Sequence, residues 1–204
     1  MIDIDSLMRR LSGKRPLFHS EFDLQFALAW ELASLCPNVR LERPFRVDRK
    51  QVEVDIVVRA EQKWIAVELK YWTASLKCDN DGESYNLKQQ GARDCRYGFW
   101  ENVERIERLM DAKLVSEGCV VALTNDEGFW NKKSRSTSDD AFKMNTGRRV
   151  KGILRWKPGT KPGYIGTRKS EIRLRSEYEV DWQEYSEVQC QGSGSFRYTV
   201  ALVQ

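Results

Sequence analysis

The sequence predicts an α/β or α+β fold in which helices flank a mixed central β-sheet. A length of 204 residues suits one domain with a hydrophobic core. Along residues 18–124 the apolar patterns indicate a helix, three strands, a second helix and a fourth strand, and further strands follow toward the C-terminus. This order is typical of a sheet covered by helices. We therefore expect a single domain over residues 1–204, with a basic, loop-rich insertion at about 126–169.

The first helix of this pattern begins after Ser20. Ser20 is a suitable N-cap, and Asp23 three residues later completes a pattern that resembles a capping box. The following run, FDLQFALAWELASLC, is apolar on nearly all sides, which predicts a largely buried helix. We expect this helix to end before Pro37, because proline cannot continue a helix.

A strand at 39–47 carries several arginines and leads into the most informative segment, VEVDIVVRAEQKWIAVELK at 52–70. We expect a hairpin here, with strands at 52–59 and 63–70 joined at Glu61–Gln62 or by a wider turn. On the second strand, alternation places Glu68 and Lys70 on one face. On the first strand, the expected apolar face opposite Asp55 comprises Val52, Val54, Ile56 and Val58.

An even-length turn makes Asp55 the direct cross-strand partner of Glu68. Directly opposed residues have Cβ atoms about 4.5–5.5 Å apart. Two carboxylates this close shift their pKa values or bind a cation. An oxygen-only pair with a neighbouring lysine suits Mg²⁺, which uses one or two carboxylates together with waters and substrate phosphate. The alternative is an ordinary charged hairpin whose acids are solvated.

After the hairpin, the polar run KCDNDGESYN predicts a loop, and a long helix follows from about Leu87 to Lys113. Charges on this helix have the spacing of i,i+4 ion pairs, which we expect between Glu101 and Arg105 and between Glu104 and Arg108.

The apolar run at 118–124 predicts a central strand of the sheet. Turn-forming and charged residues dominate 125–168, where short strands are expected near the ILRW and IGT fragments at 153–156 and 165–167. Strands at 171–180 and 195–203 complete the pattern.

The composition excludes several classes of enzyme. The chain has one histidine, His19, so multi-histidine metal centres are excluded, and a Ser-His-Asp triad would depend on this residue. Neither a phosphate-binding G-x-x-x-x-G-K-[ST] loop nor a G-x-G-x-x-G motif occurs. The five cysteines lack C-x-x-C spacing and indicate reduced thiols. Carboxylates, lysine and a metal ion remain, a set suited to phosphodiester hydrolysis.

Hydrophobic segments of the chain are short. No apolar run approaches about 18 residues, and the N-terminal run MIDIDSLMRRLSGKR lacks the apolar stretch of a signal peptide. We therefore expect a cytoplasmic protein without a membrane partner.

Positive charge is concentrated in one part of the chain. Residues 132–169 contain 12 basic and 2 acidic side chains, whereas the net charge of the whole chain is +4. A basic segment on a nearly neutral body is typical of proteins that bind a phosphate backbone, although a solvated insertion would have the same composition. The candidate nucleic-acid-binding residues are Lys132, Lys133, Arg135, Lys143, Arg148, Arg149 and Lys151.

These residues resemble the PD-(D/E)XK nuclease superfamily, which has the restriction-endonuclease-like fold. The resemblance spans about residues 18–124 and includes the α-β-β-β-α-β order of that core. It depends on Asp55, the Glu68-Leu69-Lys70 triplet, Glu21 on the preceding helix and Gln89-Gln90 on the following one. Val54 stands where the proline of the superfamily's name would be.

The resemblance implies a role for each matched residue. Asp55, Glu68 and the Leu69 backbone carbonyl would bind Mg²⁺, for which Mn²⁺ is a plausible substitute. Lys70 would act on the attacking water. Glu21 would add a metal or water contact, and Gln90, or its neighbour Gln89, would lie beside the site.

The resulting hypothesis is a Mg²⁺-dependent, endonuclease-like phosphodiesterase, with DNA favoured over RNA as substrate. Two chains, as in a homodimer, would be needed for a concerted double-strand break. The alternatives are an RNase, a catalytically inactive nucleic-acid-binding module of the same fold, and a protein-interaction domain whose acids are fortuitous.

Overall fold

The computed structural model describes residues 2–60, 62–132, 135–169 and 171–204. The elements are α1 (Ile4–Ser12), α2 (Glu21–Ala33), β1 (Val39–Val47), β2 (Lys50–Ala60), β3 (Lys63–Trp72), β4 (Leu76–Asn80), β5 (Glu83–Leu87), α3 (Ala92–Asp111), β6 (Glu117–Thr124), the 3-10 helix η1 (Asp140–Phe142), β7 (Arg149–Arg155), α4 (Pro162–Ile165), β8 (Glu171–Glu179), β9 (Gln183–Glu187), β10 (Gln191–Gly192) and β11 (Ser195–Val203).

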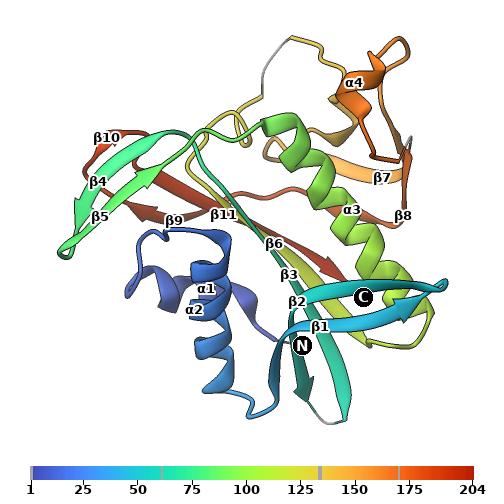
Figure 1. The fold of residues 1–204 in the computed structure, drawn as a ribbon, viewed down its shortest axis with the longest axis horizontal. Coiled ribbons are helices and arrows are strands. Elements are labelled where there is room, and N and C mark those ends of the chain that lie inside the picture. Colours follow the sequence, from blue (N-terminus) through green and yellow to red (C-terminus); the bar gives the residue numbers. More distant parts are fainter. Residues whose placement is uncertain (1, 61, 133–134, 170) are drawn as a thin grey trace.

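The main sheet has six strands in the order β1-β2-β3-β6-β11-β9 (Figure 1). Strands β3 and β6 are parallel, and the other neighbours are antiparallel, so the sheet is mixed. The chain therefore has the mixed α+β architecture that the sequence predicts.

Each face of this sheet packs on its own hydrophobic core. One core joins α1 and α2 to residues such as Val67, Leu69 and Val121. The other joins α3 to Ala66, Val120 and the segments after β6. Gly118 allows α3 to approach the sheet, because a Cβ at this position would lie 2.8 Å from the Ile106 side chain and 2.7 Å from a backbone oxygen of β3.

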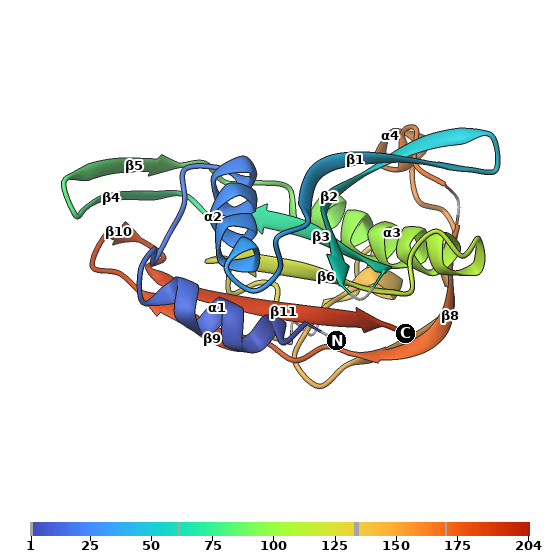
Figure 2. The ribbon, with the colours of Figure 1, turned by 90° about the horizontal axis from the view of Figure 1, so that it is seen from below.

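The β1–β2 hairpin is long, and only the inner half of β2, residues 56–60, pairs with β3. Its outer half extends beside α3 (Figure 2). Phe45, Val47 and Val54 of this outer half lie in the same core as α3, and Asp48 at the hairpin turn forms an ion pair with Arg108 of α3. The hairpin thus bends away from β3, which positions the candidate site described below.

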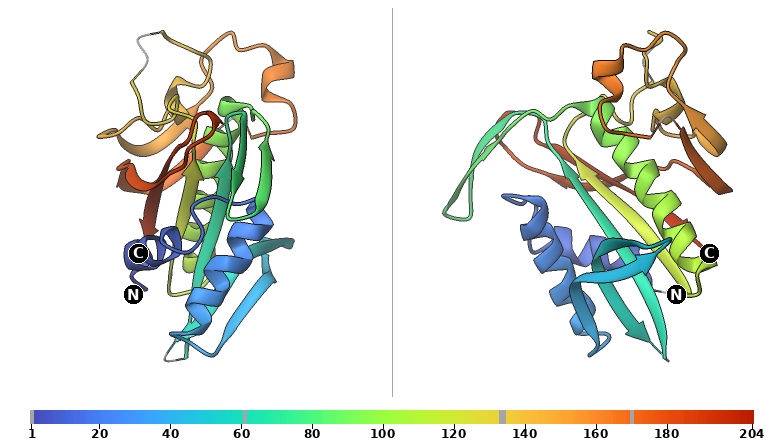
Figure 3. Two further views of the ribbon diagram at one scale, coloured as in Figure 1. Left: turned by 90° about the vertical axis from the view of Figure 1, so that its left-hand side faces the viewer. Right: turned by 45° about the vertical axis from the view of Figure 1, so that its right-hand side comes forward.

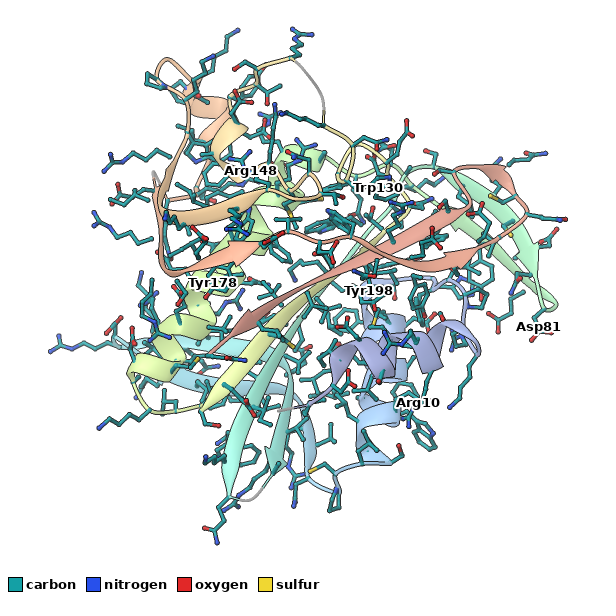
Figure 4. All side chains as sticks on the ribbon, turned by 180° about the vertical axis from the view of Figure 1, so that it is seen from behind. Arg10, Asp81, Trp130, Arg148, Tyr178 and Tyr198 are labelled. Carbon is teal, nitrogen blue, oxygen red and sulfur yellow. The ribbon has the colours of Figure 1, made fainter. Side chains whose placement is uncertain are left out.

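Two smaller sheets extend from the upper end of this body (Figure 3). One contains β10, β4 and β5, and the other pairs β7 with β8 against α3. Glu107 of α3 is buried and accepts hydrogen bonds from the backbone amides of Arg175 and Ser176 and from the hydroxyl of Tyr178 (Figure 4). These bonds attach β8 to α3.

Several predicted elements are confirmed. The strands at Val39–Val47 and Ser195–Val203 have the predicted bounds, and β6 is a buried central strand. Ser20 caps α2 by accepting a hydrogen bond from the Asp23 amide at 3.2 Å. All five cysteines are free thiols.

Other predictions are wrong. The expected loop at 77–86 is the β4–β5 hairpin, which turns at Asp81 and Gly82 with φ of 50° and 78°; Figure 4 shows Asp81 at its outer tip. The helix after it begins at Ala92 rather than near Leu87. The fragment at 165–167 begins with the last residue of the helical turn α4 and is not a strand, whereas 153–155 belongs to β7.

Helix α2 is less buried than the sequence predicts. Phe22, Phe26 and Trp30, spaced one turn apart, are 72%, 59% and 70% exposed. Leu24, Leu28 and Leu32 are fully buried on the other face. The apolar run therefore forms two faces of the helix, an exposed aromatic face and a buried leucine face.

No helix in the described ranges has the length and the hydrophobicity that a membrane crossing requires.

Candidate active site at the opening between β2 and β3

The ladder between β2 and β3 stops partway along β3. It runs from Ala60 opposite Lys63 to Ile56 opposite Val67, the register of a two-residue turn. The same register, continued by one pair, would place Asp55 opposite Glu68. On its other side β3 remains paired with β6 as far as Trp72. The strand is therefore open on one side from Glu68 onward.

Two carboxylates replace the missing strand pairing at this open side. Alternate amides of a strand face the same neighbour, so those of Leu69 and Tyr71 both face the opening. The Leu69 amide donates to Asp55 Oδ2 at 2.6 Å, and the Tyr71 amide donates to Glu21 Oε2 at 2.8 Å. Asp55 and Glu21 thus satisfy backbone donors that would otherwise be unpaired.

The predicted apolar face of β2 is wrong, because the strand bends at Asp55. Ile56 and Val58 face the core of α1 and α2, but Val54 is buried in the core of α3, and Val52 packs against that same core. The four residues therefore do not share one face. On β1, Glu42 lies between the partners of Val54 and Ile56 and has a positive φ of 50°, so the backbone is irregular on both strands here.

Gln25 of α2 holds this irregular segment in place. Its side-chain amide donates to the backbone carbonyl of Asp55 at 2.7 Å and to Glu42 Oε1 at 2.5 Å. Gln25 is 5% exposed, and sequence reasoning missed it because it occurs within an otherwise apolar helical run.

Glu68 lies on the face of β3 that packs on α3, and its side chain is 1% exposed. Asn102 Nδ2 donates to Glu68 Oε2 at 3.0 Å. Arg105 Nη1 lies 3.3 Å from Oε1 but donates its hydrogen bond to the Glu53 carbonyl, so Oε1 accepts no hydrogen bond from any described residue. The pKa of Glu68 is raised to about 8, mainly by burial; Arg105 lowers it, and the charge of Asp55 contributes to the increase.

Lys70 connects the site to α2. Its ammonium donates to Glu21 Oε1 at 3.2 Å and to the Leu69 carbonyl at 2.5 Å. Glu21 therefore bonds both the Lys70 side chain and the next amide of β3, and it fixes the lysine at the opening.

Gln90 lies near Lys70 but not where it was predicted. Gln89 and Gln90 precede α3 instead of lying on it. The Gln90 amide donates to the Thr73 carbonyl at 2.9 Å, and the Gln89 side chain bonds Asp126. Gln90 lines an open cleft together with Glu21, Lys70 and Lys88; Asp55 and Glu68 do not line this cleft.

His19 lies at the rim of the same cleft, just before α2. Its ring stacks on Tyr85 with centroids 4.1 Å apart, and its Nε2 lies 3.1 Å from Glu83. These contacts attach the β4–β5 hairpin to the start of α2.

The opening offers few oxygen atoms from side chains to a metal ion. No group of three or more His, Cys, Asp or Glu side chains among the described residues is arranged to hold a metal ion. Two carboxylates, Asp55 and Glu68, come from the adjacent strands β2 and β3, and the Leu69 carbonyl follows Glu68 directly on β3. Mg²⁺ needs only one or two carboxylates, and Glu68 Oε1 is a buried acceptor to which no described residue donates a hydrogen bond.

Most of the candidate nucleic-acid-binding residues already have acidic or carbonyl partners. Arg149 and Lys151 pair with Glu177 and Glu179 of β8, and Lys143 pairs with Asp140 at 2.7 Å. Arg148, shown in Figure 4, donates to the Ala141 carbonyl, and burial lowers its pKa. Lys132 and Arg135 are exposed, and Lys133 lies outside the described residues.

The predicted i,i+4 ion pairs of α3 are wrong. Arg105 contacts Glu68, Arg108 pairs with Asp48, and Glu104 pairs with Lys169. Glu101 accepts a hydrogen bond from Tyr97. Tertiary partners thus replace local ones, and sequence reasoning missed Asn102 and Arg105 as site residues for this reason.

Fold and site together define a mixed α+β protein with an acid from each of two neighbouring strands, and a lysine, at an opening in its sheet. Comparisons with protein-family models, with curated proteins and with solved structures find no match to this chain.

Proposed function

We propose that this chain is a Mg²⁺-dependent nuclease with a restriction-endonuclease-like core that hydrolyses phosphodiester bonds of DNA through an activated water. The observation that carries the proposal is the placement of Asp55, Glu68 and Lys70 where β2 bends away from β3. At this opening the backbone of β3 from Glu68 onward has no β2 neighbour, and the Asp55 carboxylate and the Lys70 ammonium lie beside it.

Asp55, Glu68 and the Leu69 carbonyl would hold the cation. When bound there, a divalent cation supplies positive charge next to the phosphate and lowers the pKa of a water molecule. Asp55 already has one oxygen fixed by the Leu69 amide, so its carboxylate is oriented before binding. Glu68 is oriented by Asn102 in the same way.

Lys70 is the residue that would position the attacking water or stabilise the developing negative charge. Its side chain is 20% exposed, and its ammonium has three hydrogens, of which Glu21 and the Leu69 carbonyl accept two. One hydrogen remains for water or a phosphate oxygen. Glu21 acts on the reaction through Lys70 and is therefore a positioning residue.

The surface around the cleft supports a polyanionic substrate. Lys88 and Lys70 line the cleft, and Arg93 on the first turn of α3 lies over the half-exposed ring of Tyr164 with 4.2 Å between guanidinium and ring centroid. Cations and an exposed aromatic ring are the groups that bind phosphates and stack on bases.

A cleavage assay with matched variants tests the proposal. Plasmid, linear duplex, single-stranded DNA and RNA are incubated with Mg²⁺, with Mn²⁺ and with EDTA. We expect metal-dependent cleavage of DNA that Glu68→Ala and Lys70→Ala abolish, while Glu53→Gln, which alters an exposed acid on β2, leaves it unchanged. Circular dichroism verifies that each variant is folded. Cleavage by both Ala variants at the parental rate would contradict the site assignment.

One observation favours a second function, a nucleic-acid-binding module without catalysis. Arg105 and Asn102 already contact both oxygens of Glu68. Binding of all four substrates without cleavage under every metal condition, unaffected by Glu68→Ala, would support this module.

A further inference from the structure

Arg105 lies where a cation would be needed to neutralise Glu68. Its Nη1 is 3.3 Å from Glu68 Oε1, the oxygen that accepts no hydrogen bond in the described structure. The same guanidinium donates to the Glu53 carbonyl at 3.0 Å and to Asn102 Oδ1. One side chain of α3 thus brings positive charge to the carboxylate of β3 and also bonds the backbone of β2.

The two partners differ in their access to water. Glu68 is 1% exposed and cannot reach solvent, whereas Arg105 is 28% exposed. Arginine has a long, flexible stem, so its charged group can withdraw into water while the carboxylate stays in place. Removal of Arg105 without a replacement would leave a buried carboxylate uncompensated, which is costly.

We propose that Arg105 is a built-in counter-ion that neutralises Glu68 in the metal-free protein and that competes with the divalent cation for this carboxylate. The inference rests on the proposed function, because it assumes that Glu68 is a ligand of the metal. In the metal-free state Arg105 keeps the site intact, and in the metal-bound state its guanidinium withdraws from Glu68 into water.

Metal titrations test the competition directly. Mn²⁺ is titrated calorimetrically into the parent protein and into the Arg105→Gln, Arg105→Lys and Arg108→Gln variants at pH 8.5. The pKa of Glu68 is raised to about 8, so most of this carboxyl is ionised at pH 8.5 in the parent protein. Arg108→Gln is the matched control, since it removes the same charge from the next turn of α3, where Arg108 pairs with the exposed Asp48.

We expect Arg105→Gln to bind Mn²⁺ roughly tenfold more tightly than Arg108→Gln, with Arg105→Lys between the two. Equal or weaker binding by Arg105→Gln would overturn the counter-ion role and leave the proposed function standing. Absence of Mn²⁺ binding in all four proteins would overturn both.

A double-mutant cycle provides a readout that does not depend on metal. The parent, Glu68→Gln, Arg105→Gln and the double variant are unfolded with urea in EDTA. We expect a single substitution at Arg105 to shift the urea midpoint strongly when Glu68 is present and weakly when Gln is at position 68. Equal shifts in both backgrounds would overturn the pairing itself. If Arg105→Gln does not fold, the cycle is made with Arg105→Lys and read by the same criterion.

Discussion

Helix α3 contacts two sets of buried acids, and the contrast between them distinguishes a structural acid from a candidate catalytic one. Glu107 accepts hydrogen bonds from two backbone amides and a tyrosine hydroxyl, and Glu104 accepts from Lys169 and the Arg173 amide. Glu68 has one hydrogen-bond donor, Asn102, and an oxygen that accepts none from the described residues. Burial without enough donors is tolerated at functional sites and is otherwise rare.

The difference in donors leads to a difference in charge state. Burial raises the pKa of Glu68 to about 8, so the carboxyl is largely protonated near neutral pH. A cation placed beside it would restore the ionised form. The two regions therefore predict opposite responses to the same substitution, Glu to Gln.

The largest expected effect is the loss of cleavage in Glu68→Gln. The amide retains the shape of the carboxyl but has no charge with which to bind a cation, so we expect the cleavage rate to fall by about a thousandfold or more. Stability should be retained or increased near neutral pH, because the substitution removes a buried group that is costly to ionise. Cleavage rates and urea unfolding, measured on one preparation, verify both parts; a large loss of stability would contradict the contrast.

Glu107→Gln should give the reverse pattern. The amide NH₂ would meet the amides of β8 and leave donors unpaired, so we expect unfolding free energy to fall by about 2 kcal/mol. The cleavage rate of the folded fraction should be unchanged. Urea denaturation at pH 7 measures the unfolding free energy. A Glu107→Gln protein of parental stability would show that Glu107 is not a structural acid.

Stability should depend on pH through Glu68. Its pKa is about 8 in the folded chain, above the ordinary value of 4.5, so the folded state retains a proton that the unfolded state loses. The parent should therefore lose stability relative to Glu68→Gln as pH rises from about 4.5 to about 8, and the difference should be constant above that range. Thermal midpoints of both proteins from pH 5 to 9 test this; parallel curves would contradict the raised pKa.

The smallest expected effect concerns the basic segment. Lys132 and Arg135 are exposed, whereas Arg149 and Lys151 have acidic partners on β8. The slope of binding affinity against salt concentration reports the number of phosphate contacts. Replacing Lys132 and Arg135 with Gln should reduce this slope by up to about two contacts, and replacing Arg149 and Lys151 should reduce it less. Fluorescence anisotropy at several salt concentrations compares the two double variants. An equal reduction of the salt dependence by both double variants would show that Arg149 and Lys151 contact DNA despite their ion pairs.

The local pattern of the sequence was sufficient for much of this fold. The even turn predicted the register of β2 and β3, because side-chain alternation fixes which residues are opposed. Ser20 and Asp23 predicted the start of α2. The Glu68-Leu69-Lys70 triplet predicted that an acid and a lysine share a face of β3.

Two missed elements had signals in the sequence. Ile4, Leu7, Met8 and Leu11 are the buried residues of α1 and have helical spacing. Leu76, Cys78, Tyr85 and Leu87 alternate on either side of Asp81-Gly82, a dipeptide typical of a tight hairpin turn.

The environment of Glu68 could not be predicted in the same way. Arg105 and Asn102 reach it from a helix that lies more than thirty positions later in the chain. Local spacing suggested Glu101, one turn away, as the partner of Arg105. In the structure Arg105 instead contacts the buried carboxylate of Glu68 on β3 and the Glu53 carbonyl on β2. Burial decides between these partners, and burial depends on how helix and sheet pack.

Crystals soaked in Mn²⁺ offer the most direct measurement of the central claim, that Asp55 and Glu68 hold one divalent cation. Anomalous scattering locates manganese without reference to the protein atoms. We predict one strong peak about 2.1 Å from a carboxylate oxygen of each residue, with the Arg105 guanidinium displaced from Glu68. A crystal at saturating Mn²⁺ without a peak there, and with Arg105 still on Glu68, would contradict it.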